Sequence, residues 1–311
     1  MTMSTLSGPG DDPGLSAVMG ERRQLINLAY RLLGSLAEAE DAVQETYTRW
    51  YALSPQQRNA VENPGAWLTK VAGRVCLDLL RSARARRERY VGEWIPEPVP
   101  DPAEWSTLRP GADADPADRV TLDESITMAF LVVLDSMTPA ERVAFVLHDV
   151  FRYSFAEVAE IVGRSPAACR QLASSARRRL AGSRTPAAPA AQRAGIVRDF
   201  RQAWEAKDID ALIGLLDPAV TTVTDGGGLV SAIGTVDGGE RVARAFVDIA
   251  NRVPGLTFLE RTVNGQPGLV AQQDGVVASV LAFDVADGRI TNIWVVRNPE
   301  KLGPWTAAAA R

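Results

Sequence analysis

Residues 154–180 read SFAEVAEIVGRSPAACRQLASSARRRL, and this stretch decides the fold of the region around it. Its first half carries apolar residues at the spacing of one buried helix face, namely Phe155, Val158, Ala159 and Val162. Gly163 can adopt the left-handed conformation that ends a helix, and Ser165 followed by a proline is typical of the start of the next one. Two capped helices joined by a glycine-containing turn predict a helix-turn-helix, which places its second helix in the major groove of DNA.

The outward face of the second helix is polar and basic. Its members, together with the serine at the helix start, are Ser165, Arg170, Gln171, Ser174, Arg177 and Arg178. Arginine and glutamine read base edges in the major groove, and flanking arginines neutralise phosphates. A solvated face on an ordinary helical bundle could have the same composition, but the glycine turn and the capped second helix favour DNA binding. We therefore expect these six side chains to contact duplex DNA.

The charge of the 311-residue chain is unevenly distributed. The formal net charge is −4, yet residues 91–118 carry one basic side chain against seven acidic ones. This acidic, proline-rich connector separates two mildly basic blocks, so the whole-chain charge is a poor guide to partners. The N-terminus lacks the pattern of a signal peptide, and no apolar run approaches the ~20 residues that a membrane span needs. We expect no membrane association and a cytoplasmic location.

Cysteine and histidine usage argues against several kinds of site. Cys76 and Cys169 are far apart and form no CxxC motif, which fits a reducing compartment and argues against a disulfide framework or a zinc site. His148 is the single histidine, so a Ser-His-Asp triad or a His-based metal site would rest on that one residue. We expect no catalytic residues, no metal and no cofactor.

Composition and periodicity divide the chain into segments. They are a disordered lead-in at 1–16, a helical block at 17–90, the connector at 91–118, a second helical block at 119–182, a linker at 183–192, a third domain at 193–303 and a tail at 304–311. In the third domain, helical stretches are followed by β-patterned runs separated by Gly, Pro, Asn and Asp, which predicts a curled antiparallel sheet. The expected fold is multidomain, with two all-α domains and a C-terminal α+β domain.

The first helical block carries two sets of polar residues. One set recurs at i, i+3, i+4 and i+7 and comprises Asp41, Gln44, Glu45 and Thr48. Asn63 and Pro64 start a later helix, and one side of that helix carries Lys70, Arg74 and Arg81. Basic side chains along one side of a helix suit phosphate contacts beside melted DNA. Trp67 could stack on an unpaired base, but a tryptophan at the start of an amphipathic helix is more often part of the core.

The chain up to about residue 182 resembles an extracytoplasmic-function sigma factor, the minimal two-domain initiation factor of bacterial RNA polymerase. AEDAVQETYTRWY at 39–51 resembles the polymerase-binding helix of the family. NPGAWLTKVAGRVCLDLLRSARAR at 63–86 resembles the helix that recognises and opens the minus-10 element, and residues 134–180 resemble the minus-35-binding domain. The three motifs occur in the order of the family.

The resemblance implies a role for each set of residues. Asp41, Gln44 and Glu45, with Thr48 beside them, would contact the coiled coil of the β′ subunit of core RNA polymerase. The Glu62–Asn63 loop would occupy the base-reading position at the minus-10 element, with Lys70, Arg74 and Arg81 on phosphates. The second block would lie on the β flap and read the minus-35 duplex. The acidic connector would lie along the polymerase near the path of nascent RNA, and the free protein would be monomeric.

The third domain resembles a SnoaL-like domain, the cone-shaped α+β barrel that ketosteroid isomerases and polyketide cyclases also use. WIPEP at 94–98, DGGG at 225–228 and NPEKL at 298–302 resemble the signature motifs of the sigma-factor group with a fused SnoaL-like domain. We expect these motifs to pack the third domain against the connector and the first block and so to regulate in cis. The residues concerned are Trp94, Pro96, Glu97, Asp225, Gly226, Gly227, Asn298, Pro299, Glu300, Lys301 and Leu302. The alternative is that WIPEP merely caps the first block and NPEKL is an ordinary strand exit.

A second class of function is an isomerase- or cyclase-like enzyme, or a small-ligand sensor, that carries a DNA-binding N-terminal part. The cone fold encloses an apolar pocket that could hold a small apolar ligand. Asp225, Asp274 and Asp284 are possible acids, but all lie in or near predicted turns, where aspartate usually caps or is solvated. A plain dimeric repressor is a third possibility. The polymerase-binding stripe favours a sigma factor over both.

Overall fold

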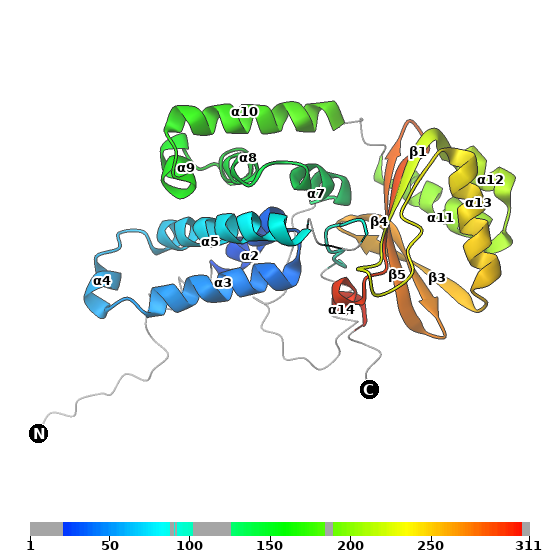
Figure 1. Ribbon diagram of the computed structural model, residues 1–311, viewed down its shortest axis with the longest axis horizontal. Coiled ribbons are helices and arrows are strands. Elements are labelled where there is room, and N and C mark those ends of the chain that lie inside the picture. The colour runs from blue at the N-terminus through cyan, green and yellow to red at the C-terminus, as the bar shows by residue number, and fades with distance from the viewer. Residues whose placement is uncertain (1–20, 88–89, 91, 102–125, 184–188, 307–311) are drawn as a thin grey trace, which may run out of the picture.

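The computed structural model describes residues 21–87, 90, 92–101, 126–183 and 189–306. The expected lead-in at 1–16, the connector after Asp101 and residues 184–188 of the expected linker lie outside the described residues. Figure 1 shows two groups of helices lying one above the other at one end of the molecule, and a sheet backed by helices at the other end. Residues 92–101 of the connector run between these two ends.

The first block is a helical bundle whose apolar faces pack together. Its described helices are α2 (Arg22–Leu33), α3 (Leu36–Tyr51), α4 (Pro55–Asn59) and α5 (Pro64–Arg87). Gly34, at a φ of 74°, ends α2, and the Ser35 hydroxyl accepts the Glu38 N–H at 3.3 Å to start α3. Trp67 is partly buried and meets Trp50 edge-on, with ring centres 5.1 Å apart, so it belongs to the core of this block.

The second block contains the expected helix-turn-helix. Its described elements are α7 (Met128–Asp135), α8 (Pro139–Phe145), the π-helix η2 (Val146–Val150), α9 (Phe155–Val162) and α10 (Pro166–Ser183). Gly163 ends α9 at a φ of 71°, and the Ser165 hydroxyl accepts the Ala168 N–H at 3.2 Å at the start of α10. His148 contacts the Tyr153 carbonyl at 2.8 Å and stacks on Phe155, which is a structural role. Both blocks contribute to one continuous hydrophobic core.

The third domain is the expected α+β domain. Its helices are α11 (Ala190–Ala206), α12 (Ile209–Leu215) and α13 (Gly239–Arg252), and its strands are β1 (Leu216–Asp225), β2 (Thr235–Asp237), β3 (Leu256–Val263), β4 (Gln266–Gln273), β5 (Val276–Ala286) and β6 (Arg289–Val296). The strand order is β2-β1-β6-β5-β4-β3. The expectation of an antiparallel sheet is wrong for one pair, because β1 and β6 are parallel. The crossover through β2 and α13 sets the direction of β1 against the β3–β6 meander, and alternation along a strand carries no information on that direction.

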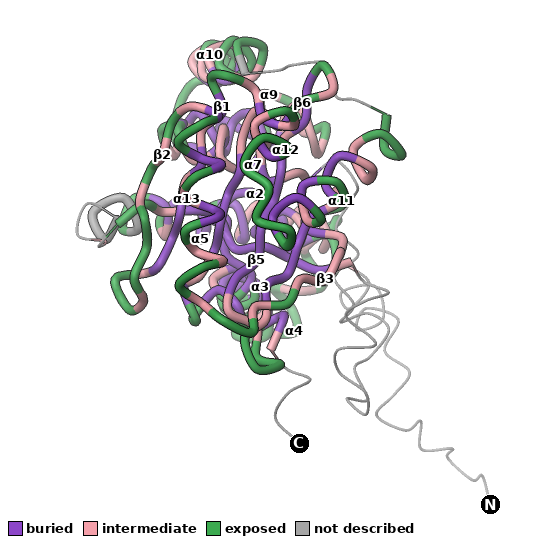
Figure 2. Tube along the Cα trace, turned by 90° about the vertical axis from the view of Figure 1, so that its right-hand side faces the viewer, coloured by how far each residue is buried: buried purple, intermediate pink, exposed green. Residues whose placement is uncertain are grey.

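Both faces of the sheet are covered, and successive residues of its central strands point to opposite faces. Leu281 and Phe283 of β5 face α11–α13, whereas Val280 and Ala282 face the opposite way. On that opposite face they pack with Ile95 of the connector, with residues of α7 and α14 (Gly303–Thr306), and with Leu302, which follows η3 (Pro299–Lys301). Figure 2 shows buried chain through the middle of the molecule and exposed chain at its periphery. The outer face of the sheet is therefore an interdomain interface.

The end of the third domain differs from expectation. The boundary expected at residue 303 falls inside the interface, because α14 inserts Trp305 into the apolar cluster on the outer face of the sheet. Trp305 is 3 % exposed, and its indole N–H donates to the Pro98 carbonyl at 2.8 Å. A short, alanine-rich end of chain contains no periodic pattern from which this packing could be predicted. None of the described helices is long and apolar enough to cross a membrane.

Candidate functional site

The face of α10 expected to read DNA is accessible. Arg170, Gln171, Arg177 and Arg178 are exposed, as is Ser165 at the helix start, whereas Ser174 is half-buried. Arg170 lies over the Phe155 ring, 5.1 Å from its centre, and Arg177 pairs with Asp149 at 2.7 Å. Surface contacts of this kind are weak, so both guanidinium groups can exchange them for phosphate or base contacts.

The expected polymerase-binding stripe lies on the outward face of α3. Asp41, Gln44, Glu45 and Thr48 are all exposed, while Val43 and Trp50 on the opposite side are buried. Glu45 pairs with Arg49 one turn later at 2.8 Å, an exposed i, i+4 contact. The stripe is thus a continuous polar surface on a helix anchored by its apolar face.

The expected minus-10 residues are divided between exposed surface and a contact with the second block. Glu62 and Asn63 are exposed in the loop before α5, and the Asn63 side chain accepts the Ala66 N–H at 3.0 Å as a helix cap. Lys70 forms an ion pair with Glu160 of α9, and Arg74 donates to the Glu160 carbonyl at 2.9 Å.

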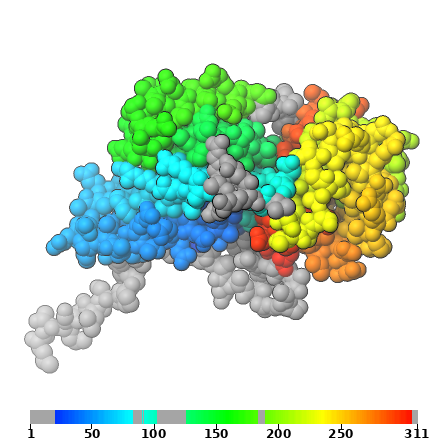
Figure 3. Space-filling model, in the orientation of Figure 1, coloured from blue at the N-terminus to red at the C-terminus, as the bar shows by residue number. Residues whose placement is uncertain are grey.

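Two further contacts involve the basic side of α5, one within the helix and one with α9. Arg81 pairs with Asp78 of the same helix at 3.3 Å. The position where Gly73 would carry a Cβ is 3.0 Å from the Ile161 side chain, so α9 lies directly against α5. In this arrangement the second block covers part of the surface expected to hold minus-10 DNA. Figure 3 shows the two blocks in contact along their length.

The motifs WIPEP, DGGG and NPEKL meet at one buried carboxylate, that of Asp225 at the end of β1. The carboxylate accepts from the Lys301 ammonium at 2.6 Å, the Ile95 N–H at 3.1 Å, the Tyr90 hydroxyl at 2.6 Å and the Gly227 N–H at 3.0 Å. Asp225 is fully buried, and a buried carboxylate is stable only where hydrogen bonds and a counter-charge satisfy it. These donors come from the end of the first block, from the connector, from the turn after β1 and from η3.

Lys301, the partner of Asp225 in this ion pair, also contacts the connector. It is 5 % exposed, and its ammonium also donates to the Ile95 carbonyl at 2.5 Å. The ammonium lies over the Trp94 ring, 3.2 Å from the ring centre, which is a cation–π contact. Two neighbouring residues of the connector, Trp94 and Ile95, therefore bind one lysine of the C-terminal domain.

The glycines of DGGG bring the backbone close to NPEKL. Gly227 has a φ of 65°, and a Cβ built on it would lie 2.5 Å from the Asn298 Cγ. Gly226 is similarly restricted, since its Cβ would lie 2.4 Å from the Val230 carbonyl oxygen. The Asn298 amide donates to the Tyr90 hydroxyl at 2.9 Å, while its oxygen accepts the Glu300 N–H. Only glycine permits this approach without distortion.

Glu97 binds the other end of the WIPEP motif to the first block. Its carboxylate accepts the Leu36 N–H at 2.8 Å and the Ser35 hydroxyl at 3.1 Å, at the start of α3. Its backbone N–H donates to the Gly34 carbonyl at 2.8 Å, and its carbonyl accepts the Tyr30 hydroxyl at 2.6 Å. Burial raises the pKa of the Glu97 carboxyl, against the lowering effect of the hydrogen bonds from Leu36 and Ser35.

We call residues 94–99 together with Asp225–Gly227 and Asn298–Leu302 the interdomain cluster. Of its expected members, Pro96 and Leu302 are buried, whereas Pro299 and Glu300 are exposed. The structure therefore brings most of the expected residues together, with the first block on one side and the third domain on the other.

The interdomain cluster also includes four residues that no sequence pattern had indicated. They are Tyr30, Tyr90, Asn264 and Trp305. Asn264, in the β3–β4 turn, exchanges hydrogen bonds with Val99 and donates to the Tyr30 hydroxyl at 2.8 Å. Burial raises the pKa of both tyrosines, so both phenols remain protonated donors. The Asn-Gly pair at 264–265 is a hairpin signal, but nothing in it indicates a partner elsewhere in the chain.

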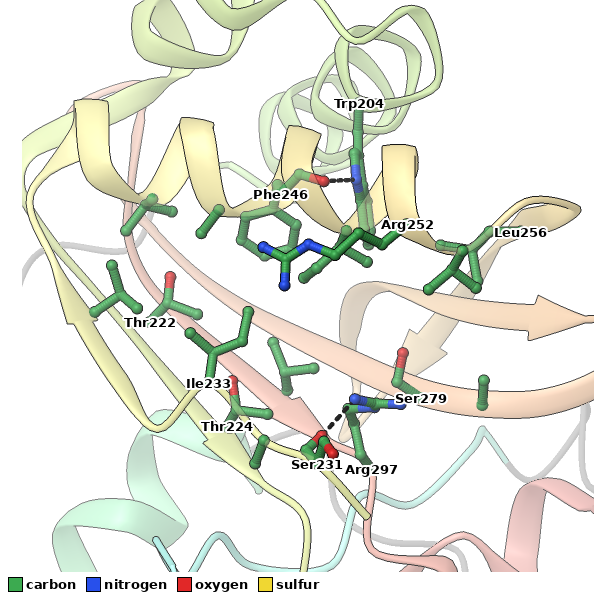
Figure 4. Close-up of a pocket in the computed structure, with 18 of the residues that line it drawn as sticks. Trp204, Thr222, Thr224, Ser231, Ile233, Phe246, Arg252, Leu256, Ser279 and Arg297 are labelled. Carbon is green, nitrogen blue, oxygen red and sulfur yellow. Dashed lines mark hydrogen bonds between the residues drawn. The ribbon is translucent and has the colours of Figure 1, made fainter.

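The three possible acids of the enzyme interpretation lie apart from one another. Asp225 is held in the ion pair with Lys301, and Asp274 occupies a hairpin turn at a φ of 52°. Asp284 is on β5, where burial raises its pKa. None of the three is among the described residues that line the pocket of the third domain (Figure 4).

The comparisons with known proteins agree with this architecture. Residues 17–86 match the family Sigma-70 region 2, and residues 127–180 match Sigma-70, region 4. The chain is 40 % identical to the ECF RNA polymerase sigma factor SigJ of Mycobacterium tuberculosis over 90 % of both chains, and 35 % identical to the probable sigma factor SigI of the same organism over 95 % of this chain and 97 % of that one.

A solved structure gives the same result. The crystal structure of Mycobacterium tuberculosis SigJ matches with a TM-score of 0.73 and 36 % identity, covering 93 % of this chain and 98 % of that chain. Two helical sigma domains followed by a SnoaL-like α+β domain define the class of protein. The chain belongs to the extracytoplasmic-function family of RNA polymerase sigma factors.

Proposed function

We propose that the C-terminal domain regulates this sigma factor in cis through the interdomain cluster. The observation that carries the proposal is the position of residues 94–99, which hydrogen-bond to α2 and α3 on one side and to Asp225, Lys301, Asn264 and Trp305 on the other. Because the same short segment contacts both domains, a change in one domain alters the position of the connector relative to the other.

The second part of the proposal assigns the contacts with polymerase and promoter. Sigma factors bind core RNA polymerase and promoter DNA. We assign the exposed stripe of α3 to the β′ coiled coil, the second block to the β flap and the minus-35 duplex, and the α5 surface to minus-10 DNA. The support is the exposure of Asp41, Gln44 and Glu45 and of the α10 arginines. These contacts involve binding alone, and the Asp225 carboxylate is already committed to Lys301.

The third part of the proposal is that the two helical blocks of the free protein form a closed arrangement. Glu160 occupies Lys70 and Arg74, so the blocks separate before α5 can hold minus-10 DNA. The Arg142 guanidinium also donates to the Leu32 carbonyl across the two blocks at 2.8 Å. We infer that the free monomer is closed and that polymerase, with binding surfaces for both blocks, stabilises the open form.

Run-off transcription with purified core polymerase tests the proposal. The full chain is compared with Asp225→Asn, with Lys301→Met and with a chain ending at Arg184. We expect promoter-dependent transcript from the full chain, and a changed yield from the same promoters with the variants. An unchanged yield from all variants would contradict regulation in cis. A change of promoter choice would mean that the C-terminal domain acts on DNA readout.

A further inference from the structure

The third domain contains a pocket between α13 and the sheet (Figure 4). Its volume is about 470 Å³, within the range of about 300–1,000 Å³ that is usual for small-molecule sites. Most of the lining is apolar, including Trp204, Val242, Phe246, Ile249, Leu256 and Val295. The Trp204 and Phe246 rings meet edge-on with centres 4.7 Å apart, and the Trp204 N–H donates to the Phe246 carbonyl at 2.7 Å. This aromatic wall suits a flat apolar body.

The charged side chains at the pocket have one sign. Arg252, at the end of α13, and Arg297, just after β6, both line it, and no acidic side chain is among the described lining residues. Figure 4 shows both guanidinium groups at the pocket. Arg252 has a loose contact with Asp248 at 3.5 Å, in which both side chains are mostly exposed, and Arg297 donates to the Ser231 carbonyl at 2.5 Å. Two cations beside an apolar cavity favour an anionic ligand.

A buried hydroxyl gives the second indication of a ligand. Thr222 of β1 lines the pocket and is 6 % exposed, and its hydroxyl has no hydrogen-bond partner among the described residues. Buried hydroxyls are almost always hydrogen-bonded, because an unmade hydrogen bond in a low-dielectric interior is costly. A ligand with a hydroxyl or carbonyl group on its apolar body would supply the missing partner.

We propose that this pocket binds an amphipathic organic anion with a flat apolar body. In the proposed complex the body lies against Trp204 and Phe246, a polar substituent hydrogen-bonds to Thr222, and the anionic group lies between Arg252 and Arg297. The ligand is bound without turnover. The two arginines favour such an anion over a purely apolar ligand, because they stabilise an anionic group and form no comparable contact with a neutral hydrocarbon.

The pocket is next to the interdomain cluster along two segments of the chain. Thr222 and Thr224 line the pocket, and Asp225 follows directly on β1. Arg297 lines the pocket and precedes Asn298, and its backbone N–H donates to the Asp225 carbonyl at 2.7 Å. A ligand that draws the Arg297 side chain away from Ser231 therefore acts on residues adjoining the Asp225–Lys301 pair. That coupling rests on the proposed function, whereas binding does not.

Two fluorescent probes with the same apolar body test the ligand class. 1-Anilinonaphthalene-8-sulfonate carries one sulfonate, and N-phenyl-1-naphthylamine lacks it. We expect the full chain to bind the sulfonate about tenfold more tightly, the value of one charge-assisted contact. Arg252→Gln should remove most of that difference and leave the neutral probe unaffected. Arg244→Gln, an exposed arginine on the same helix that pairs with Glu240, is the matched control and should change neither affinity.

The remaining variants locate the probe in the pocket. Ala245→Phe, at a lining position of α13, should weaken both probes, and circular dichroism shows whether the variant is folded. Equal affinity for the two probes, or equal effects of the Arg252 and Arg244 substitutions, would overturn the proposal. Run-off transcription with and without the sulfonate tests the coupling separately. Arg252-dependent binding without any change in transcript yield would support the ligand class and overturn its coupling to the cluster.

Discussion

The ammonium of Lys301 lies 2.6 Å from the Asp225 carboxylate and 3.2 Å from the centre of the Trp94 ring, and both charged groups are buried. The pair thus depends on contacts from a connector that is not part of its own domain. Without Trp94 and the Ile95 backbone, the two charges would lose donors, acceptors and shielding at once. The ion pair therefore links the C-terminal end of the chain to the connector.

Asp225→Asn should weaken this interface by about 3 kcal/mol, because it leaves a buried ammonium without its counter-charge. Hydrogen exchange at residues 94–99 should become faster as the interface loses stability. Lys301→Met in the same chain should restore part of the protection, since it removes the uncompensated cation. If the double variant is no better protected than Asp225→Asn, the Gly227 and Tyr90 hydrogen bonds matter more than the charge pair.

Gly227→Ala should lower the stability of the C-terminal domain and separate Asn298 from Tyr90, because a Cβ would lie 2.5 Å from the Asn298 Cγ. The expected cost is about 2 kcal/mol, which combines a left-handed backbone with a steric clash. Gly234→Ala is the matched control, since Gly234 has a φ of 73° but no described atom within 4 Å of the position that its Cβ would take. Urea unfolding should show a larger loss for Gly227→Ala; equal losses would mean that backbone strain alone is responsible.

Glu160→Gln should increase binding of single-stranded minus-10 DNA, because it removes the carboxylate that pairs with Lys70. Arg74 keeps its contact, since it donates to the backbone carbonyl of residue 160. The ion pair is largely exposed and solvent screens it, so we expect a modest increase of about two- to fivefold. Fluorescence anisotropy with a labelled oligonucleotide measures the change. Asp78→Asn also removes one negative charge, and it frees Arg81 without touching the second block. An equal increase in DNA binding with Asp78→Asn would mean that the loss of charge, and not release from the second block, is responsible.

Glu97 should make the interface more stable as pH falls. Burial raises the pKa of its carboxyl above the ordinary 4.5, so the folded protein takes up this proton at a higher pH than the unfolded chain does. The free energy of unfolding, relative to that of Glu97→Gln, should therefore rise as the pH falls through the raised pKa. It should level off near pH 4.5, where the unfolded chain also takes up the proton. Urea midpoints of both proteins at several pH values give the difference. A relative stability that drops on acidification would mean that Leu36 and Ser35 hold the carboxylate ionised.

The sequence predicted much of the fold because its local signals are strong. Capping serines, prolines at helix starts and Gly163 mark the helix-turn-helix, and β3 and β6 begin and end where their apolar patterns do. The parallel β1–β6 pair and the burial of Trp305 were not predictable in this way, since both depend on contacts between segments far apart in the chain.

The same distinction applies to the candidate site. WIPEP, DGGG and NPEKL could be singled out as motifs, but their shared centre at Asp225 required knowledge of three-dimensional contacts. Tyr30 and Asn264 are 234 positions apart, and each alone is an ordinary residue in a helix or a turn. The pairing of Lys70 with Glu160 likewise joins two surfaces that each look solvated in sequence.

Arg178 and Arg177 should differ in their contribution to minus-35 DNA binding. Arg178 is exposed, while Arg177 is held by Asp149 at 2.7 Å and gives up that contact on binding phosphate. Arg178→Ala should lower affinity for a minus-35 duplex and reduce the slope of log K against log salt by about 1, as expected for one lost phosphate contact. Asp149→Asn should raise the affinity, because it frees Arg177. Binding of the isolated β′ coiled coil serves as the control and should not change, because α3 and α10 lie on opposite sides of the helical blocks (Figure 1). If Arg178→Ala lowered the affinities for the coiled coil and for DNA together, α10 would not be assigned to the DNA surface.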